Sequence, residues 1–181
     1  MNTEVKFAKV HPNAIIPSKR DEDMGFDIYA CFEEDYMIIS PHETKLIPTG
    51  IASACNPNYG FLLRERGSTG SNGIALRCGV IDSGYRNEWF IGLTNTTEKY
   101  LIISKFDIQS VIDKETENFD KETSLLVEEF IENSFVYPYS KAIAQALVVP
   151  VPKVDVEEIS YDELKSIESE RGLGKLGSSN K

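Results

Sequence analysis

The sequence predicts an all-β protein, a barrel or a sandwich built from many short strands. In the first hundred residues, short apolar runs are interrupted at close intervals by Gly, Pro and Asn, which is typical of such folds. Within Tyr59–Arg64 the apolar positions partly alternate with others, as on a half-buried strand. No internal repeat or linker divides the chain. The expected strands are Tyr36–Ile39, Leu46–Ala52, Tyr59–Leu63, Trp89–Leu93, Tyr100–Ile103 and Ala144–Val149.

Two segments interrupt the β pattern with helical signals. One is polar and acidic, and the spacing of its apolar residues predicts a short amphipathic helix at about Lys121–Asn133. The other, Tyr161–Arg171, could hold a further helical turn or two, with Asp162 as its cap and Gly172 at its end. The residues that follow are rich in Gly and Ser, so we expect them to be flexible.

The composition argues against several classes of function. The chain has 181 residues and a formal net charge of −10, so nucleic-acid backbones and anionic membranes should repel it. No apolar run approaches the roughly 20 residues of a membrane span, and the polar N-terminus lacks a signal-peptide core, which indicates a cytoplasmic protein. Cys31, Cys55 and Cys78 are expected as buried reduced thiols. With only two, widely separated histidines, a zinc site and His-assisted nucleophilic catalysis are both disfavoured.

The few arginines mark a candidate anion site. Four of the six, Arg64, Arg66, Arg77 and Arg86, lie close together in the sequence, and Arg171 stands in the Gly-rich tail. A guanidinium can bind a phosphate through two parallel hydrogen bonds. The alternative is that these arginines are solvated residues at strand ends.

Two segments that contain these arginines are also rich in Gly and Ser. Arg66–Gly73 could turn backbone N–H groups and hydroxyls toward a phosphate oxygen, although most such loops are only turns. Arg171–Ser179 has the same chemistry, far away in the sequence. The pair suggests a polyphosphate held from two sides, with the tail closing over it as a lid.

Asp82 is the candidate catalytic base. It follows the apolar residues Val80 and Ile81 and precedes a turn that contains Gly84. A carboxylate fixed at the end of a strand can orient and deprotonate a water molecule. The competing interpretation is an Asp that caps a turn, which is the commoner role for such a residue taken alone.

Five short segments carry most of these glycines, hydroxyls and charged side chains: Met24–Ala30, Arg66–Gly70, Gly79–Tyr85, Ala142–Ala146 and Arg171–Ser179. In this order they resemble the five motifs of the trimeric dUTP pyrophosphatases, the all-β dUTPases. The resemblance implies a distorted β-barrel of the β-clip or jelly-roll type and a homotrimer with three active sites at subunit boundaries. It also implies hydrolysis of dUTP to dUMP and pyrophosphate, which keeps uracil out of DNA and supplies dUMP for dTMP synthesis.

The resemblance assigns catalytic roles to several residues. Magnesium would be held by the three phosphates and water rather than by a protein cage, with Asp27 near its water shell. Asp82 would activate a water molecule for attack on the α-phosphorus. Tyr85 would pack beneath the deoxyribose and leave no room for a 2′-hydroxyl. The hairpin around Arg77–Val80 would read uracil through its backbone and exclude the methyl group of thymine.

The same resemblance implies the substrate-binding residues. Arg66, Ser68, Gln145 and Arg171 would bind phosphates or ordered water and stabilise the charge that develops during transfer. The full implied set is Arg66, Gly67, Ser68, Gly79, Val80, Ile81, Tyr85, Gln145, Arg171, Leu176, Gly177 and Ser178.

The chain departs from the family pattern at four places. The usual Arg-Ser-Gly is replaced by Arg followed by Gly67 and Ser68, so the serine is displaced by one position. Asn87 replaces a glycine, and Ala142 stands where Arg or Lys is usual. Leu176 replaces the Phe that stacks on uracil, so it keeps an apolar contact but loses the ring face. We therefore expect weaker lid closure than a Phe would give.

The predicted organisation is one domain, residues 1–170, followed by a lid at residues 171–181. The domain includes an insertion at about residues 104–140, because the connection Thr96–Ser140 is longer than the usual loop between the third and fourth motifs and is comparable to that of some phage members. The insertion is either a surface elaboration on its own subunit or a docking surface for another protein. The second hypothesis depends on apolar residues amid acidic ones: Leu125, Leu126, Phe130, Ile131, Phe135, Tyr137 and Tyr139.

Two other functions stay open. A dCTP deaminase, or a bifunctional deaminase and pyrophosphatase, uses the same fold, but these enzymes usually have Trp at the position of Tyr85. A regulatory protein that binds a partner through the insertion is the other alternative. The presence of Asp82, Gln145 and Arg171 argues against an inactive site.

Overall fold

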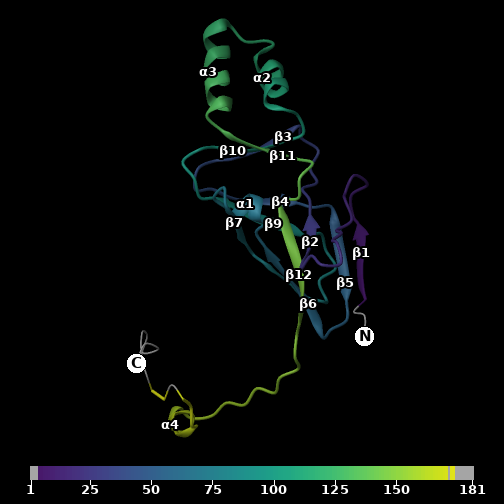
Figure 1. Cartoon of the computed structure of the whole chain (residues 1–181), viewed down its shortest axis with the longest axis vertical. Helices are drawn as coiled ribbons and strands as arrows, with labels where there is room; N and C mark the ends of the chain where they lie inside the picture. The colour runs from purple at the N-terminus through teal and green to yellow at the C-terminus, as the bar shows by residue number, and fades with distance from the viewer. Residues whose placement is uncertain (1–3, 171, 174–181) are drawn as a thin grey trace.

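The body of the protein consists of four small β-sheets (Figure 1), as seen in a computed structural model that describes residues 4–170, 172 and 173. The central sheet has the strand order β2-β12-β6-β8 and is antiparallel throughout. Its strands are β2 (Gly25–Ile28), β12 (Ala144–Pro150), β6 (Tyr59–Arg64) and β8 (Val80–Ile81). This sheet matters most for function, because three of the five motifs contribute its strands.

The other three sheets complete the body. One has the order β4-β9-β7, another joins β1 to β5, and the third has the order β11-β10-β3. The prediction of an all-β fold is therefore confirmed. The strands are β4 (Thr44–Pro48), β9 (Phe90–Asn95), β7 (Ile74–Arg77), β1 (Val5–Lys9), β5 (Ile51–Cys55), β11 (Phe135–Pro138), β10 (Leu101–Ser104) and β3 (Tyr36–Ile39).

One expected strand is in fact two. The apolar run Leu46–Ala52 is divided between β4 and β5, which belong to different sheets. Between them Gly50 has a φ of 65°, a left-handed conformation that side chains other than Gly rarely adopt. A Cβ atom at Gly50 would also lie 2.8 Å from the Cβ of Ala14. The break is therefore imposed by the backbone and not by the hydrophobic pattern.

Aromatic side chains fill the centre of the core. Trp89 is fully buried, and its ring meets Phe61 edge to face with the centroids 4.9 Å apart. The ring of Phe7 packs against both. Such edge-to-face pairs stabilise a core beyond the area that they bury. Since Phe61 lies on β6, this packing fixes the strand that leads into the Arg66 loop.

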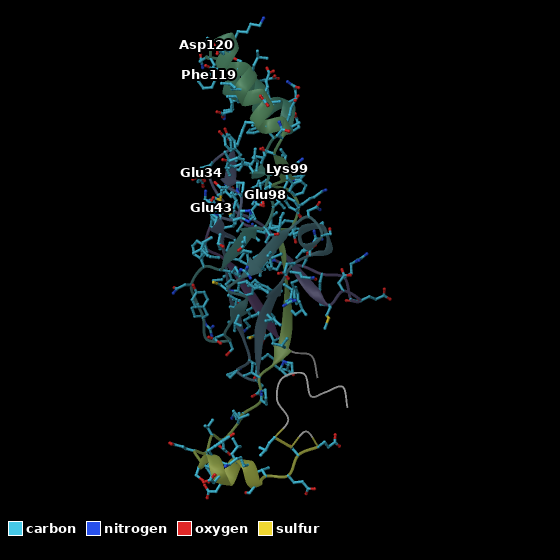
Figure 2. All side chains as sticks on the ribbon, turned by 90° about the vertical axis from the view of Figure 1, so that its left-hand side faces the viewer. Glu34, Glu43, Glu98, Lys99, Phe119 and Asp120 are labelled. Atoms are coloured by element: carbon cyan, nitrogen blue, oxygen red, sulfur yellow. The ribbon has the colours of Figure 1, made fainter. Side chains whose placement is uncertain are left out.

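The insertion forms two helices that project from the body (Figure 1). In the chain they lie between β10 and β11. Helix α3 (Lys121–Glu132) matches the expected helix, whereas α2 (Ile108–Thr116) was missed. Both begin at an Asp whose carboxylate accepts a backbone N–H, Asp107 for α2 and Asp120 for α3. Figure 2 shows Asp120 at the far tip of this projection and Glu98 at its base.

The helices have a small core of their own. Its buried members are Val111, Ile112 and Ile131, and half-buried Tyr36, Val127 and Phe130 pack against them. The ion pair between Lys114 and Asp35 also ties α2 to the body. Because β10 and β11 are parallel, a crossover connection must join them, and the two helices provide it.

The chain leaves the body after β12 and carries α4 (Tyr161–Ser166) away from it (Figure 1). Every residue from 151 to 170 is exposed. The cap of α4 is Ser160 and not Asp162 as expected, because Ser160 and Glu163 form a reciprocal capping box. Within the described part of the chain, none of the helices has the length and apolar character of a membrane span.

Candidate active site

A cavity of about 920 Å³ collects residues from three of the five sequence motifs. Four cationic side chains face it, Lys19, Arg20, Arg66 and Lys141, against the two carboxylates of Asp23 and Asp27. We call it the Arg66 cavity. In a chain with a net charge of −10, this local excess of positive charge suits an anionic ligand. The remaining lining residues are Ser18, Met24, Gly25, Gly67, Ser68 and Gln145.

Arg66 and Asp27 form an ion pair on the wall of this cavity. Arg66 Nε lies 3.0 Å from Asp27 Oδ1, and Arg66 Nη2 lies 3.4 Å from Oδ2. The guanidinium also donates through Nη1 to the carbonyl of Ala142 at 3.3 Å. Both side chains remain about one third exposed. The pair therefore orients the guanidinium while leaving it accessible to a ligand from the cavity side.

The segment expected as a Gly- and Ser-rich loop contains one turn of helix, α1 (Gly67–Gly70). Thr69 is buried, and its hydroxyl accepts the backbone N–H of Arg66 at 3.0 Å. Side chains within the loop bind its carbonyl groups, since Ser71 Oγ donates to Gly67 at 2.6 Å. Gly67 and Ser68 stay exposed at the cavity. The loop is thus held in one shape with its first two residues facing the ligand space.

Gln145 is held in place by a backbone group that directly follows the neighbouring strand β6. Its Nε2 donates to the carbonyl of Glu65 at 2.8 Å. On β12 it lies opposite Asp27 of β2, and its side chain crosses over Gly25. A Cβ atom at Gly25 would lie 2.8 Å from Gln145 Oε1, so glycine leaves the room that this amide needs.

The third motif forms a second and separate cluster. Val80, Ile81 and Asp82 line a different, smaller cavity of about 160 Å³, together with apolar residues of β6 and β12. Asp82 does not line the Arg66 cavity. The predicted site residues therefore fall into two groups within one chain: Asp27, Arg66, Gly67, Ser68 and Gln145 in the first, and Gly79, Val80, Ile81, Asp82 and Tyr85 in the second.

The turn at Asp82 is made by its backbone. The carbonyl of Asp82 accepts the N–H of Tyr85 at 3.1 Å, and Tyr85 donates its hydroxyl to the carbonyl of Glu88 at 3.1 Å. No donor from residues 4–170, 172 or 173 reaches the Asp82 carboxylate, which is exposed. The side chain is thus not used to cap the turn and is available for other chemistry.

The hairpin before Asp82 approaches β6 very closely. The carbonyl of Gly79 accepts the N–H of Leu63 at 2.7 Å, and a Cβ atom at Gly79 would lie 2.9 Å from the carbonyl oxygen of Leu63. Cys78, in the turn of the hairpin, has a φ of 55° and is exposed. The expectation of three buried thiols is therefore confirmed only for Cys31, because Cys55 is half-buried and Cys78 lies in an exposed turn.

Several residues at the site were not predicted. Glu65 Oε1 accepts the N–H of Leu76 at 2.9 Å, and this hydrogen bond is the main reason why the pKa of Glu65 lies below its usual range. Glu65 thereby connects the Arg66 loop to β7. Lys19 and Arg20 reach the cavity because Ser18 forms a β-bridge with Asp27. Two sequence signals could have indicated these residues: Glu65 stands between two arginines, and Lys19 and Arg20 form a basic pair in an acidic chain.

Other expectations lie partly outside the cavity or outside the described residues. Arg86 donates to the carbonyls of Ser53 and Ser83 and so supports the turn. Arg171, Leu176, Gly177 and Ser178 lie outside the described residues. Within the part of the chain that is described, no group of three or more His, Cys, Asp or Glu side chains could hold a metal ion.

Comparison with solved structures identifies the fold. The dUTPase of Staphylococcus bacteriophage 80alpha, solved with dUpNHpp, superimposes with a TM-score of 0.68 at 19% identity, covering 98% of this chain and 99% of that one. The D95N dUTPase of phage phi11 of S. aureus, described as coordinating a structural Mg(II) ion, gives 0.59 at 19% identity, covering 86% and 96%. The fold is that of the phage dUTPases.

Sequence comparison shows the family. The dUTPase family model matches residues 11–108. The deoxyuridine 5′-triphosphate nucleotidohydrolase of Nautilia profundicola is 31% identical over 182 residues, covering 98% of this chain and 99% of that protein. The chain therefore belongs to the dUTPase family, and the resemblance drawn from the five motifs is confirmed.

Proposed function

We propose that the protein hydrolyses dUTP to dUMP and pyrophosphate, keeping uracil out of DNA and supplying dUMP for dTMP synthesis. The family and the nucleotidohydrolase from Nautilia profundicola support this reaction. The single observation that carries it is the Arg66 cavity, a cationic pocket in an acidic chain where Arg66, Ser68 and Gln145 converge. Fixed donors of this kind stabilise negative charge on phosphoryl oxygens as it develops.

The triphosphate binds in the Arg66 cavity. Arg66 keeps its Nε contact with Asp27 and turns its other N–H groups to phosphate oxygens. The Ser68 hydroxyl and backbone N–H groups at Gly67 donate to the same oxygens, and Gln145 orients phosphate or ordered water. These contacts stabilise the pyrophosphate leaving group.

Magnesium is the proposed cofactor. The residues fit a metal that its substrate carries, because Asp27 offers one carboxylate at the cavity and the described residues contain no protein cage. When bound, magnesium supplies positive charge that lowers the electron density on the phosphates. Asp27, about one third exposed, would then accept hydrogen bonds from the metal's water molecules while it orients Arg66.

Asp82 is the proposed general base. Its exposed carboxylate takes a proton from a water molecule, whose oxygen bonds to the α-phosphorus while the bond from that phosphorus to the bridging oxygen of the pyrophosphate breaks. Tyr85, with its hydroxyl bound to Glu88, holds its ring beneath the deoxyribose. The backbone of Gly79, Val80 and Ile81 reads uracil.

The two clusters are proposed to meet between subunits of a homotrimer. Within one chain Asp82 lines a different cavity from Arg66, which supports an arrangement in which a neighbour supplies one half of each site. The exposed stretch after β12 supports this assembly, because Val154 is 73% exposed and Val156 is 92% exposed on their own subunit. Large apolar side chains at such exposure are typical of segments that pack on a partner.

The proposed organisation follows from this assembly. Residues 1–170 form the catalytic domain with the insertion at about residues 104–140, and residues 171–181 form a lid that brings Arg171, Leu176, Gly177 and Ser178 over the substrate. The protein works in the cytoplasm, without nucleic acid or membrane as a partner.

The insertion is proposed to have a protein partner. Leu125 is 55% exposed and Leu126 is 63% exposed on α3, although Ile131 of the same helix is buried. This outward apolar pair has no role in the small core of the insertion. Deletion of the insertion should abolish a partner interaction and leave the trimer intact. Loss of the trimer alone would contradict a docking role.

A substrate panel tests the reaction. Pyrophosphate release is measured with dUTP, dTTP, dCTP and UTP, each with magnesium and with a chelator. We expect release from dUTP alone, and only with magnesium. Ammonia release from dCTP would instead indicate a deaminase. Asp82→Asn should nearly abolish turnover while dUTP still binds, and full turnover by this variant would refute the mechanism.

A further inference from the structure

We propose that Tyr137, a residue of the insertion, is a positioning residue for the phosphate-binding loop. It acts through the Ser68 hydroxyl, while its own proton is held by the carbonyl of Ala142. The inference rests on the proposed hydrolysis of dUTP in the Arg66 cavity. It assigns a functional link between the insertion and the chemistry, which the five motifs do not contain.

The fold places the hydroxyl of Tyr137 beside the loop that contains Ser68. Tyr137 lies on β11, in register with Ile103 of β10, and only 3% of its surface is exposed. Its ring belongs to the main hydrophobic core and lies 6.3 Å from the ring of Phe135. A buried Tyr needs a partner for its hydroxyl, and the partners here belong to the active site.

The hydrogen bonds have a defined direction. The Tyr137 hydroxyl donates to the carbonyl of Ala142 at 2.7 Å, and its oxygen lies 3.4 Å from Ser68 Oγ. A phenol has one proton, which is used on Ala142, so Ser68 must be the donor to Tyr137. The carbonyl of Ala142 also accepts Arg66 Nη1 at 3.3 Å. The Tyr137 hydroxyl therefore contacts Ser68 directly and shares the carbonyl of Ala142 with Arg66.

This arrangement explains how a displaced serine can still work. Ser68 stands one position later than the family's usual serine and lies exposed on its loop. Without a partner its side chain would sample several staggered rotamers. Tyr137 selects the rotamer that places Ser68 Oγ beside the Tyr137 hydroxyl. Rotation of the hydroxyl alone then turns its proton from Tyr137 to a phosphate oxygen.

The contact also connects the insertion to catalysis. Strand β11 is the segment by which the chain returns from α3 to the body. A change in the position of α3 that moves β11 therefore moves the Tyr137 hydroxyl relative to Ser68. The insertion is in this way part of the support of the active site and not only a surface attachment.

A double-mutant cycle tests the proposal. Turnover of dUTP is measured for the unaltered trimer, Tyr137→Phe, Ser68→Ala and the double variant, with a thermal unfolding curve for each. Tyr137→Phe keeps the buried ring, so we expect cooperative unfolding. Because Tyr137 orients Ser68 before the substrate binds, kcat/KM should fall about twofold to tenfold, as for the loss of one neutral hydrogen bond. If Tyr137 acts through Ser68, the double variant should be no slower than Ser68→Ala.

Tyr139→Phe is the matched control. Tyr139 lies two residues along, with its ring 4.9 Å from Phe32 and its hydroxyl beside the thiol of Cys31, away from the loop. It should keep the kcat/KM of the unaltered chain. Equal kcat/KM for Tyr137→Phe and the unaltered chain, or effects that multiply in the double variant, would overturn the inference alone. An unaltered chain that releases no pyrophosphate from dUTP would refute the proposed function, and the inference with it.

Discussion

Replacement of Glu65 by Ala should loosen the connection between the Arg66 loop and the hairpin around Arg77–Val80. Glu65 Oε1 accepts the N–H of Leu76, which immediately precedes Arg77 and the turn of the hairpin. The carbonyl of the same residue holds the Gln145 amide. Loss of the carboxylate leaves the Leu76 N–H without its acceptor on one edge of β7.

The size of the effect follows from the burial of this contact. Hydrogen bonds to charged groups contribute about 1.5–3 kcal/mol. The Glu65 side chain is 30% exposed, so solvent screening reduces this to about 1–2 kcal/mol. For a chain of this size each kcal/mol changes Tm by about 2–4 °C, so Glu65→Ala should lower Tm by about 2–8 °C. Glu65→Gln keeps a neutral acceptor and should lose about half as much.

Thermal unfolding across a pH series is the assay. The folded pKa of Glu65 is lowered, chiefly by the Leu76 N–H, so its stabilisation is fully present above the ordinary carboxyl pKa of about 4.3 and is lost as the pH falls through the folded pKa. The Tm difference between the unaltered chain and Glu65→Ala should therefore shrink in acid. A difference that is absent at pH 7, or that stays constant into acid, would refute this reasoning.

Three further substitutions separate packing from chemistry. Gly25→Ala would place a Cβ atom 2.8 Å from Gln145 Oε1 and 3.0 Å from Gln145 Cβ, so it should displace this amide, raise KM for dUTP severalfold and lower Tm. Gly79→Ala meets the Leu63 backbone carbonyl, which cannot retreat, so it should cost about 1–3 kcal/mol and lower Tm. Leu176→Phe should lower the Michaelis constant and protect the tail from protease when substrate is bound. An unchanged constant and unchanged protection would contradict our view of the lid.

Local hydrophobic patterns predicted the strands that stand alone and failed where two strands adjoin. Tyr36–Ile39 matches β3 because turns bound that run on both sides. The run around Gly50 appears continuous in sequence, and only the left-handed backbone at Gly50 divides it. Helix α2 was missed although Ile108, Val111 and Ile112 have helical spacing, since its partners on α3 and β3 are distant in the chain.

The site was predictable as a set of residues but not as a geometry. The motifs identified Asp27, Arg66, Ser68 and Gln145, and the fold brings all four to one cavity. That Asp82 lies elsewhere depends on sheet topology, which no local pattern shows.

The additional contacts at the cavity are likewise nonlocal. The β-bridge between Ser18 and Asp27 places Lys19 at the cavity, and the parallel pairing of β11 with β10 places Tyr137 next to Ser68. Both pairings join segments that are separated in sequence, so the side-chain chemistry alone could not place them.

Mixing two inactive variants tests most directly whether each active site is shared between subunits. Asp82→Asn and Arg66→Ala are purified separately, unfolded, mixed in equal amounts and refolded, and pyrophosphate release from dUTP is measured. In a randomly assembled trimer, a site with Arg66 from one subunit and Asp82 from its neighbour is intact in about one quarter of cases, so about one quarter of the normal activity should return. Activity no higher than that of either variant refolded alone would contradict the account.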